Sequence, residues 1–146
     1  MDMSKDIVMY LVEDDPGDQK LIKSALAAQE EQIDLHIADS AEEALKHLEY
    51  TYDGKSQHPL PSLILLDLNM PGMGGKELLK WLKANEKFKN IPVVILTTSD
   101  SEADINECYK LHAAGYIQKP GSVQELKMIM KQTIKYWSSN LSFAKN

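Results

Sequence analysis

The sequence is poor in cysteine, because Cys108 is the single one among 146 residues. One thiol cannot build an internal disulfide framework or a metal cluster of the usual cysteine kind. Cys108 lies in a segment with the pattern of an amphipathic helix, and we interpret it as a helix residue without chemistry of its own. Disulfide-stapled folds and cysteine-metal sites are therefore excluded.

Concentrated positive charge is also missing. The 16 basic residues are outnumbered by 22 acidic ones, the net charge is −6, and the pI is about 5.2. Proteins that bind nucleic acid hold its phosphates mainly through clustered Lys and Arg, and no such patch or run stands out here. We therefore expect no nucleic-acid partner.

Long apolar runs are absent as well. Residues 1–5 are polar, and the apolar run after them is too short for a signal peptide core or a membrane span. We expect a cytoplasmic protein with no membrane partner. A length of 146 residues with 43% hydrophobic residues fits one domain, which we place at residues 1–138, followed by a tail at 139–146.

Five strand-like segments alternate with helical patterns. Continuous apolar runs at 7–12, 63–66 and 92–96 predict buried strands, whereas the amphipathic segments 33–38 and 116–118 predict edge strands. Helices are expected at 16–28, from 40 through 48, at 76–85, at 102–114 ended by Gly115, and at 122–137, with a long loop at 51–62. This order predicts an α/β fold with a doubly wound, five-stranded parallel sheet in the order 2-1-3-4-5, flavodoxin-like, with helices on both faces.

Two helix starts carry recognisable caps. Asp15 precedes Pro16, so we interpret it as the N-cap of the first helix rather than as a metal ligand. Ser40 and Glu43 have the spacing of a capping box at the start of the second helix.

Acidic residues follow two of the buried strands. Glu13, Asp14 and Asp67 should converge at the carboxyl edge of the sheet, where the winding reverses and ligands bind. Like charges in one small space need a compensating cation, and oxygen ligands without His or Cys favour Mg²⁺. The fourth and fifth strands deliver Thr97 and Lys119 to the same edge. Asp67 could then attack a phosphoryl group while a hydroxyl and an ammonium stabilise its oxygens.

Four segments, in order along the chain, resemble the signature of response-regulator receiver domains: Leu-Val-Glu13-Asp14-Asp15, Leu-Leu-Asp67-Leu-Asn-Met-Pro71, Val-Ile-Leu-Thr97-Thr-Ser and Tyr116-Ile-Gln-Lys119-Pro120. The resemblance spans nearly the whole chain. The long loop before the third strand and the aromatic end of the last helix are also similar to small stand-alone regulators that serve phytochrome-type histidine kinases.

The resemblance implies a role for each matching position. Asp67 would accept a phosphoryl group from a histidine kinase or phosphotransfer protein, and the chain would be a two-component phosphorelay switch with no enzymatic activity beyond its own phosphorylation and dephosphorylation. The other implied roles are Mg²⁺ binding by Glu13, Asp14, Asp67 and the backbone carbonyl of Asn69, a switch pair of Thr97 and Tyr116, and a cis peptide bond between Lys119 and Pro120.

Further expectations concern the surface that signals to a downstream protein and the lifetime of the acyl phosphate. Phosphorylation would draw Thr97 inward, let Tyr116 turn in and change a protein-binding surface formed by the last two helices and the last strand. Asn69 and Ser99, each two residues beyond a site residue, would tune the lifetime of the acyl phosphate. Apolar residues left over on helix 122–137 leave a homodimer open.

The sequence leaves three alternatives open. A phosphatase of the haloacid-dehalogenase type would need a second acid where Asn69 stands. A flavin or nucleotide binder would need a phosphate loop after the first strand, where Glu13, Asp14 and Asp15 would repel the ligand. A receiver fold that only scaffolds partners is the third. His36, His47, His58 and His112 show no ligand spacing, and we interpret them as ordinary surface or loop histidines.

Overall fold

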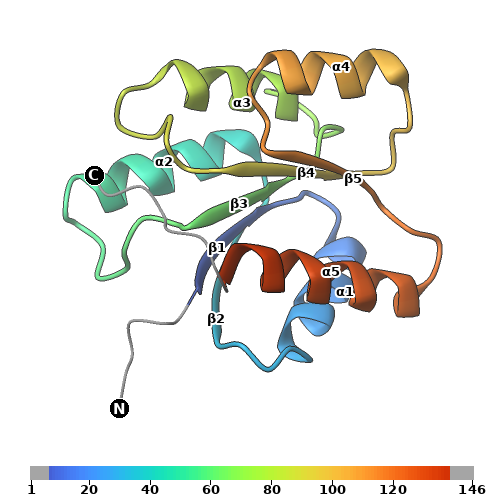
Figure 1. Cartoon of the computed structure of the whole chain (residues 1–146). Helices are drawn as coiled ribbons and strands as arrows, with labels where there is room; N and C mark the ends of the chain where they lie inside the picture. The colour runs from blue at the N-terminus through green and yellow to red at the C-terminus, as the bar shows by residue number, and fades with distance from the viewer. Residues whose placement is uncertain (1–6, 139–146) are drawn as a thin grey trace.

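The computed structural model describes residues 7–138, in which five strands alternate with five helices (Figure 1). The elements are β1 (Ile7–Val12), α1 (Pro16–Ala27), β2 (Ile33–Ala38), α2 (Ala41–Tyr52), β3 (Leu63–Leu66), α3 (Gly75–Ala84), β4 (Val93–Thr97), α4 (Glu102–Lys110), β5 (Gly115–Gln118) and α5 (Val123–Ser138). The expected tail at 139–146 lies outside the described residues.

All strands are parallel and form one sheet in the order β2-β1-β3-β4-β5, which confirms the expected topology. β1, β3 and β4 are buried along their whole length, while β2 and β5 are mostly half-buried at the two edges. The continuous apolar runs thus mark the strands that have a neighbour on each side.

Helices cover both faces of the sheet. Figure 1 shows α2, α3 and α4 on one side and α1 and α5 on the other. Alternate residues of the central strands point to opposite faces of the sheet. Tyr10 and Ile64 pack with α2 and α3, whereas Leu11 and Leu65 pack with α1 and α5. Two apolar layers therefore hold the sheet in place.

The end of α4 differs from the expectation. The helix stops at Lys110 rather than at residue 114, and the left-handed residue after it is His112, with φ 70°, not Gly115. The backbone N–H of Ala114 donates to the carbonyl of Val93 at 2.8 Å, so the chain is already joining the sheet, and Gly115 lies within β5. Pairing with β4 overrides the helical pattern. α2 is also longer than expected, reaching Tyr52.

Both predicted caps are present. Asp15 accepts a hydrogen bond from the N–H of Asp18 at 2.8 Å and is the N-cap of α1. Ser40 accepts from the N–H of Glu43 at 3.0 Å, but the Glu43 carboxylate accepts from the N–H of Asp39, one residue before the usual capping-box partner.

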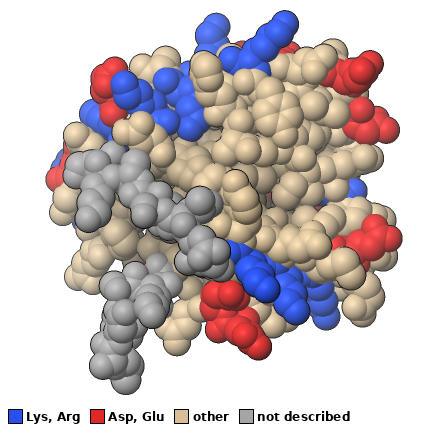
Figure 2. All heavy atoms as spheres, in the orientation of Figure 1, with Lys and Arg blue, Asp and Glu red and all other residues tan. Residues whose placement is uncertain are grey.

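The surface carries mixed charge. On the face seen in Figure 2, small groups of basic side chains lie beside acidic ones, with uncharged residues between them. On α5, Leu126, Met130 and Ile134 are buried, whereas Val123 is 45% exposed. Within residues 7–138, no helix has the length and apolar character needed to cross a membrane.

Candidate functional site

Three carboxylates meet where β1 and β3 end. Glu13 and Asp14 follow β1, Asp67 follows β3, and one oxygen of each lies within 4.8 Å of one oxygen of each of the others. Glu13 and Asp67 are only 1% and 6% exposed, while Asp14 is half-buried. The convergence expected from the sequence is confirmed for these three residues.

Main-chain hydrogen bonds fix the position of the acids. The N–H of Asp67 donates to the carbonyl of Val12 at 3.0 Å, and the N–H of Glu13 donates to the carbonyl of Ala38 at 3.1 Å. The sheet ladder thus continues one residue beyond each strand. Gly75 opens α3 so close to Asp67 that a Cβ at this position would lie 2.3 Å from the Asp67 carbonyl oxygen. The glycine lets α3 begin beside the acids.

Lys119 brings positive charge into this acidic group. Its N–H donates to the carbonyl of Thr97 at 2.7 Å, which holds the end of β5 against β4. Its ammonium donates to Glu13 Oε1 at 2.5 Å and to Asp18 Oδ2 at 2.8 Å, and lies 3.9 Å from Asp67 Oδ1. One ammonium therefore faces carboxylates from three segments.

The burial of these charges affects their titration. Burial raises the pKa of Glu13 to about 7, although hydrogen bonds from Lys119 and from the Asp15 N–H act in the opposite direction. Burial alone would lower the pKa of Lys119, but its hydrogen bonds to Asp18 and Glu13 outweigh this effect, and its pKa is raised. Lys119 is therefore cationic at neutral pH, whereas burial disfavours the ionised form of Glu13.

Thr97 ends β4 at the same edge of the sheet. It is fully buried, and among the described residues its hydroxyl has no hydrogen-bond partner. Buried polar groups are nearly always paired, so an unpaired hydroxyl suits a site that binds a polar group. β4, which ends in Thr97, is the strand next to β3, but the Thr97 hydroxyl makes no hydrogen bond to Asp67 in this structure.

Tyr116 and Ser99 belong to a network beside the site. The Tyr116 hydroxyl donates to the Ser99 carbonyl at 2.9 Å, and the Ser99 hydroxyl donates to Asp104 at 2.5 Å. Lys76 in turn contacts Asp104 at 2.5 Å and Glu107 at 2.8 Å. The β4–α4 segment is therefore tied to β5, α3 and α4.

Two expectations need correction. Among the described residues no peptide bond is cis, so the bond between Lys119 and Pro120 is trans in this structure. The trans form is intrinsically favoured by about 0.5–1 kcal/mol before proline. The interpretation of the histidines as ordinary surface or loop residues also needs correction, because the rings of three of them, His36, His47 and His58, lie together, with centroids 5.9 Å apart between His36 and His47 and 4.4 Å apart between His36 and His58. They come from different elements, so spacing along the chain could not reveal this.

The sequence reasoning also missed two polar neighbours. Asp18 binds the Lys119 ammonium, and the Gln19 side chain donates to the Glu13 carbonyl at 2.6 Å and to Asp39 at 2.8 Å. Both residues lie in the first turn of α1, immediately after the acidic segment, and that position was the available signal. Asn69 is exposed, and its role as a metal ligand through the backbone carbonyl stays a prediction.

Comparison with known proteins agrees with this geometry. The model of the response regulator receiver domain matches residues 9–131. Response regulator Rcp1 of Synechocystis sp. is 35% identical over 130 residues, which cover 89% of this chain and 88% of that protein.

Solved structures of similar proteins share the fold. The phosphorylated cyanobacterial phytochrome response regulator RcpA superposes with a TM-score of 0.86 and 34% identity, covering 95% of this chain and 99% of that one. The Mn²⁺-bound form of Rcp1 superposes with a TM-score of 0.84 and 33% identity over the same shares. These matches confirm the resemblance to regulators of phytochrome-type systems. The chain therefore belongs to the response regulator receiver domain family of two-component signalling proteins.

Proposed function

We propose that Asp67 is the phosphoacceptor and that the chain acts as a phosphorylation switch in the cytoplasm. A carboxylate oxygen of Asp67 would attack the phosphorus of a phosphohistidine, the P–N bond would break with its electron pair returning to the imidazole, and an acyl phosphate would form. The observation that carries this proposal is the group of three carboxylates around Asp67 with the Lys119 ammonium 3.9 Å away.

The donor set fits a hard divalent cation. Its ligands would be carboxylate oxygens from Glu13, Asp14 and Asp67, without nitrogen or sulfur, and a divalent cation would favour the ionised form of Glu13, whose pKa is raised mainly by burial. We propose Mg²⁺ as the natural ion, with the Asn69 carbonyl as a further ligand; the Mn²⁺-bound form of Rcp1 supports a divalent ion in a similar protein. When bound, Mg²⁺ would supply positive charge next to the phosphoryl oxygens.

The remaining side chains would stabilise and read the phosphoryl group. Lys119 can leave Asp18, which is exposed enough to be solvated, and donate to a phosphoryl oxygen. The free hydroxyl of Thr97 can donate to another oxygen. Movement of Thr97 toward the phosphoryl group would release Tyr116 from the Ser99 carbonyl and change the surface of α4, β5 and α5, where a downstream protein would bind.

Two residues near the site would control the lifetime of the acyl phosphate. Asn69 is exposed beside Asp67 and could orient the attacking water. Ser99 is already bound to Asp104, so its effect would come through the position of the β4–α4 segment. Substitutions at either position should change the rate of dephosphorylation more than the rate of uptake.

The phosphoryl donor would be a histidine kinase or a phosphotransfer protein. The likeness to RcpA, a cyanobacterial phytochrome response regulator, supports a kinase of the phytochrome type. Phosphotransfer profiling against a panel of purified kinases tests this choice, and preferential labelling by a kinase of another class would reject it. We propose no enzymatic activity beyond formation and hydrolysis of the acyl phosphate.

Acetyl phosphate and Mg²⁺ provide the direct test of Asp67. Intact-protein mass spectrometry should show one added phosphoryl group on the wild type and none on Asp67→Asn. Asp53→Asn, at an exposed acid after α2, is the matched control and should be labelled like the wild type. A wild type that takes up no phosphoryl group, or an Asp67→Asn variant that does, would favour the scaffold alternative or another acceptor.

The oligomeric state is a separate proposal. α5 leaves Met128 62% exposed and Tyr136 64% exposed, and apolar surface of this kind can belong to a contact between protein molecules. We propose that this surface contributes to a homodimer. Sedimentation velocity of the phosphorylated chain should show a dimer that Met128→Lys weakens, and an unchanged monomer at all concentrations would reject the idea.

A further inference from the structure

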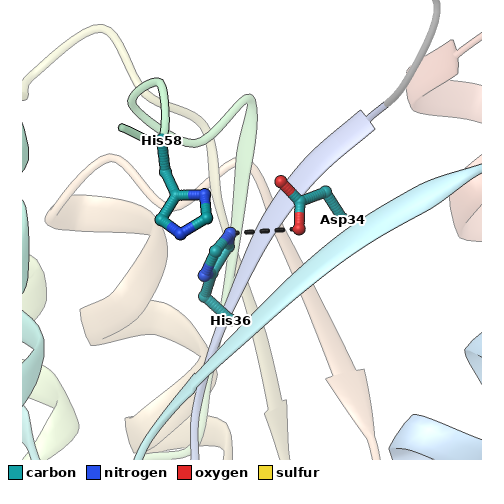
Figure 3. Close-up of side chains that lie close together, drawn as sticks. All are labelled: Asp34, His36 and His58. Atoms are coloured by element: carbon teal, nitrogen blue, oxygen red, sulfur yellow. Dashed lines mark ion pairs between the residues drawn. The ribbon is translucent and has the colours of Figure 1, made fainter. Parts of the chain in front are cut away.

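A second cluster of metal-ligating side chains lies at the β2 edge, away from the acidic site. Asp34 and His36 are two residues apart on β2 and so point to the same side of the sheet. His58 reaches them from the loop between α2 and β3 (Figure 3). This loop enters β3 at its amino end, whereas Glu13 and Asp67 follow the carboxyl ends of their strands. Because the strands are parallel, the loop and the acidic site lie at opposite ends of the strands.

The three side chains are close enough to share one ion. One ligand atom from each lies within 4.8 Å of the others, and His36 Nε2 is 3.2 Å from Asp34 Oδ1. A tetrahedral zinc ion with bonds of about 2.0–2.1 Å holds its ligand atoms about 3.3 Å apart. The Asp34–His36 pair therefore already has the spacing of one edge of such a site.

The remaining adjustment falls on the residue that can move most easily. His58 is exposed and belongs to a loop, whereas Asp34 and His36 are half-buried on a paired strand. Closing the last gap to bonding distance requires a shift of the His58 side chain and its loop, not of the sheet. The rigid pair and the adjustable third ligand suit binding of an ion to a partly formed site.

The surroundings of His36 supply an independent observation. Its Nε2 is buried and, despite the nearby Asp34 carboxylate, has no partner in hydrogen-bonding geometry within residues 7–138. The rings of Tyr10 and His47 pack against the His36 ring, at 5.5 and 5.9 Å between centroids, and the His36 side chain is only 16% exposed. A buried nitrogen without a hydrogen bond is rare, and a metal ion would use its lone pair.

We propose that Asp34, His36 and His58 bind a divalent transition metal of the zinc class, with water in the fourth position. Two imidazoles and one carboxylate suit zinc and its neighbours in the series, whereas Mg²⁺ prefers oxygen ligands alone. The ion would fasten the α2–β3 loop to the edge strand β2. This site is independent of the proposed phosphorylation of Asp67, and either could fail without the other.

Calorimetric titration of the tag-free, full-length chain with Zn²⁺ tests the site. Excess Mg²⁺ is kept present so that the acidic site does not bind zinc. We expect one zinc ion per chain. His58→Gln should weaken zinc binding at least about 10-fold, because the loss of a residue that only supports a metal ligand already costs about that much. Because His58 is exposed on a loop, this variant should fold, which circular dichroism can check.

Two controls separate this site from other sources of binding. His112→Asn removes a histidine far from β2 and keeps a residue that tolerates φ 70°, and Asp67→Asn removes an acid of the other site. Both should bind zinc like the wild type. No zinc binding by the wild type, unchanged affinity in His58→Gln, or an equal loss in either control would overturn the proposal.

Discussion

Replacement of Gly75 by alanine tests how tightly α3 is packed against the phosphoacceptor strand. An added Cβ would lie 2.3 Å from the Asp67 carbonyl oxygen and 2.7 Å from Leu68 Cα. Both neighbours are backbone atoms, so no side chain can rotate to make room, and α3 or the end of β3 must shift. Overpacking of this kind costs about 1–3 kcal/mol, whereas alanine gains at most about 1 kcal/mol over glycine from helix propensity.

The steric cost should therefore exceed the gain, and we expect Gly75→Ala to lower the free energy of unfolding by about 2 kcal/mol. With a urea m-value of about 2 kcal/mol/M, the midpoint of denaturation should fall by about 1 M. Displacement of Asp67 should also slow phosphoryl uptake from acetyl phosphate.

Gly121→Ala is the matched control for this prediction. Nothing lies within 4 Å of a Cβ at this position, and its backbone is not in the left-handed region. The control should therefore leave the free energy of unfolding unchanged or raise it by up to about 1 kcal/mol, and the urea midpoint should follow. A Gly75→Ala variant as stable and as quickly phosphorylated as the Gly121→Ala variant would refute the close approach of α3 to β3.

Three further predictions concern single residues. Thr97→Val should raise the free energy of unfolding by about 1 kcal/mol, because it removes a buried hydroxyl without a partner. The same variant should take up the phosphoryl group more slowly. A loss of stability in urea denaturation would show that the hydroxyl is paired. The pKa of Asp104 is lowered by hydrogen bonds from Lys76 and Ser99, so its ionised form stabilises the fold. Asp104→Asn should cost up to about 1 kcal/mol at pH 7, and the difference should disappear as the pH falls through the lowered pKa of Asp104; a difference that persists in acid would contradict this ion pair. His112→Gly should raise the free energy of unfolding by about 0.5–1 kcal/mol, because glycine relieves the strain of the positive φ. His112→Ala should not raise it, and thermal unfolding of both variants measures the difference.

The local patterns of the sequence were sufficient for the order of elements and the sheet. Apolar runs and helical periodicity depend on neighbouring residues, so β1, β3 and the cap at Asp15 could be recognised without the fold. The rule that ligands bind at the carboxyl ends of parallel strands then predicts that Glu13 lies beside Asp67. The end of α4 could not be found in this way, because pairing of Ala114 with β4 decides it.

Only the tertiary structure decided which side chains meet. Lys119 bonds to Asp18, 101 positions away, and His36 lies against His58 because a loop returns across the edge of β2. Such contacts depend on the path of loops and on which strand faces outward, and no periodicity in the chain encodes either. The sequence determined the fold and its acidic site, whereas the three-dimensional path of the chain assembled the histidine cluster and chose the partners of Lys119.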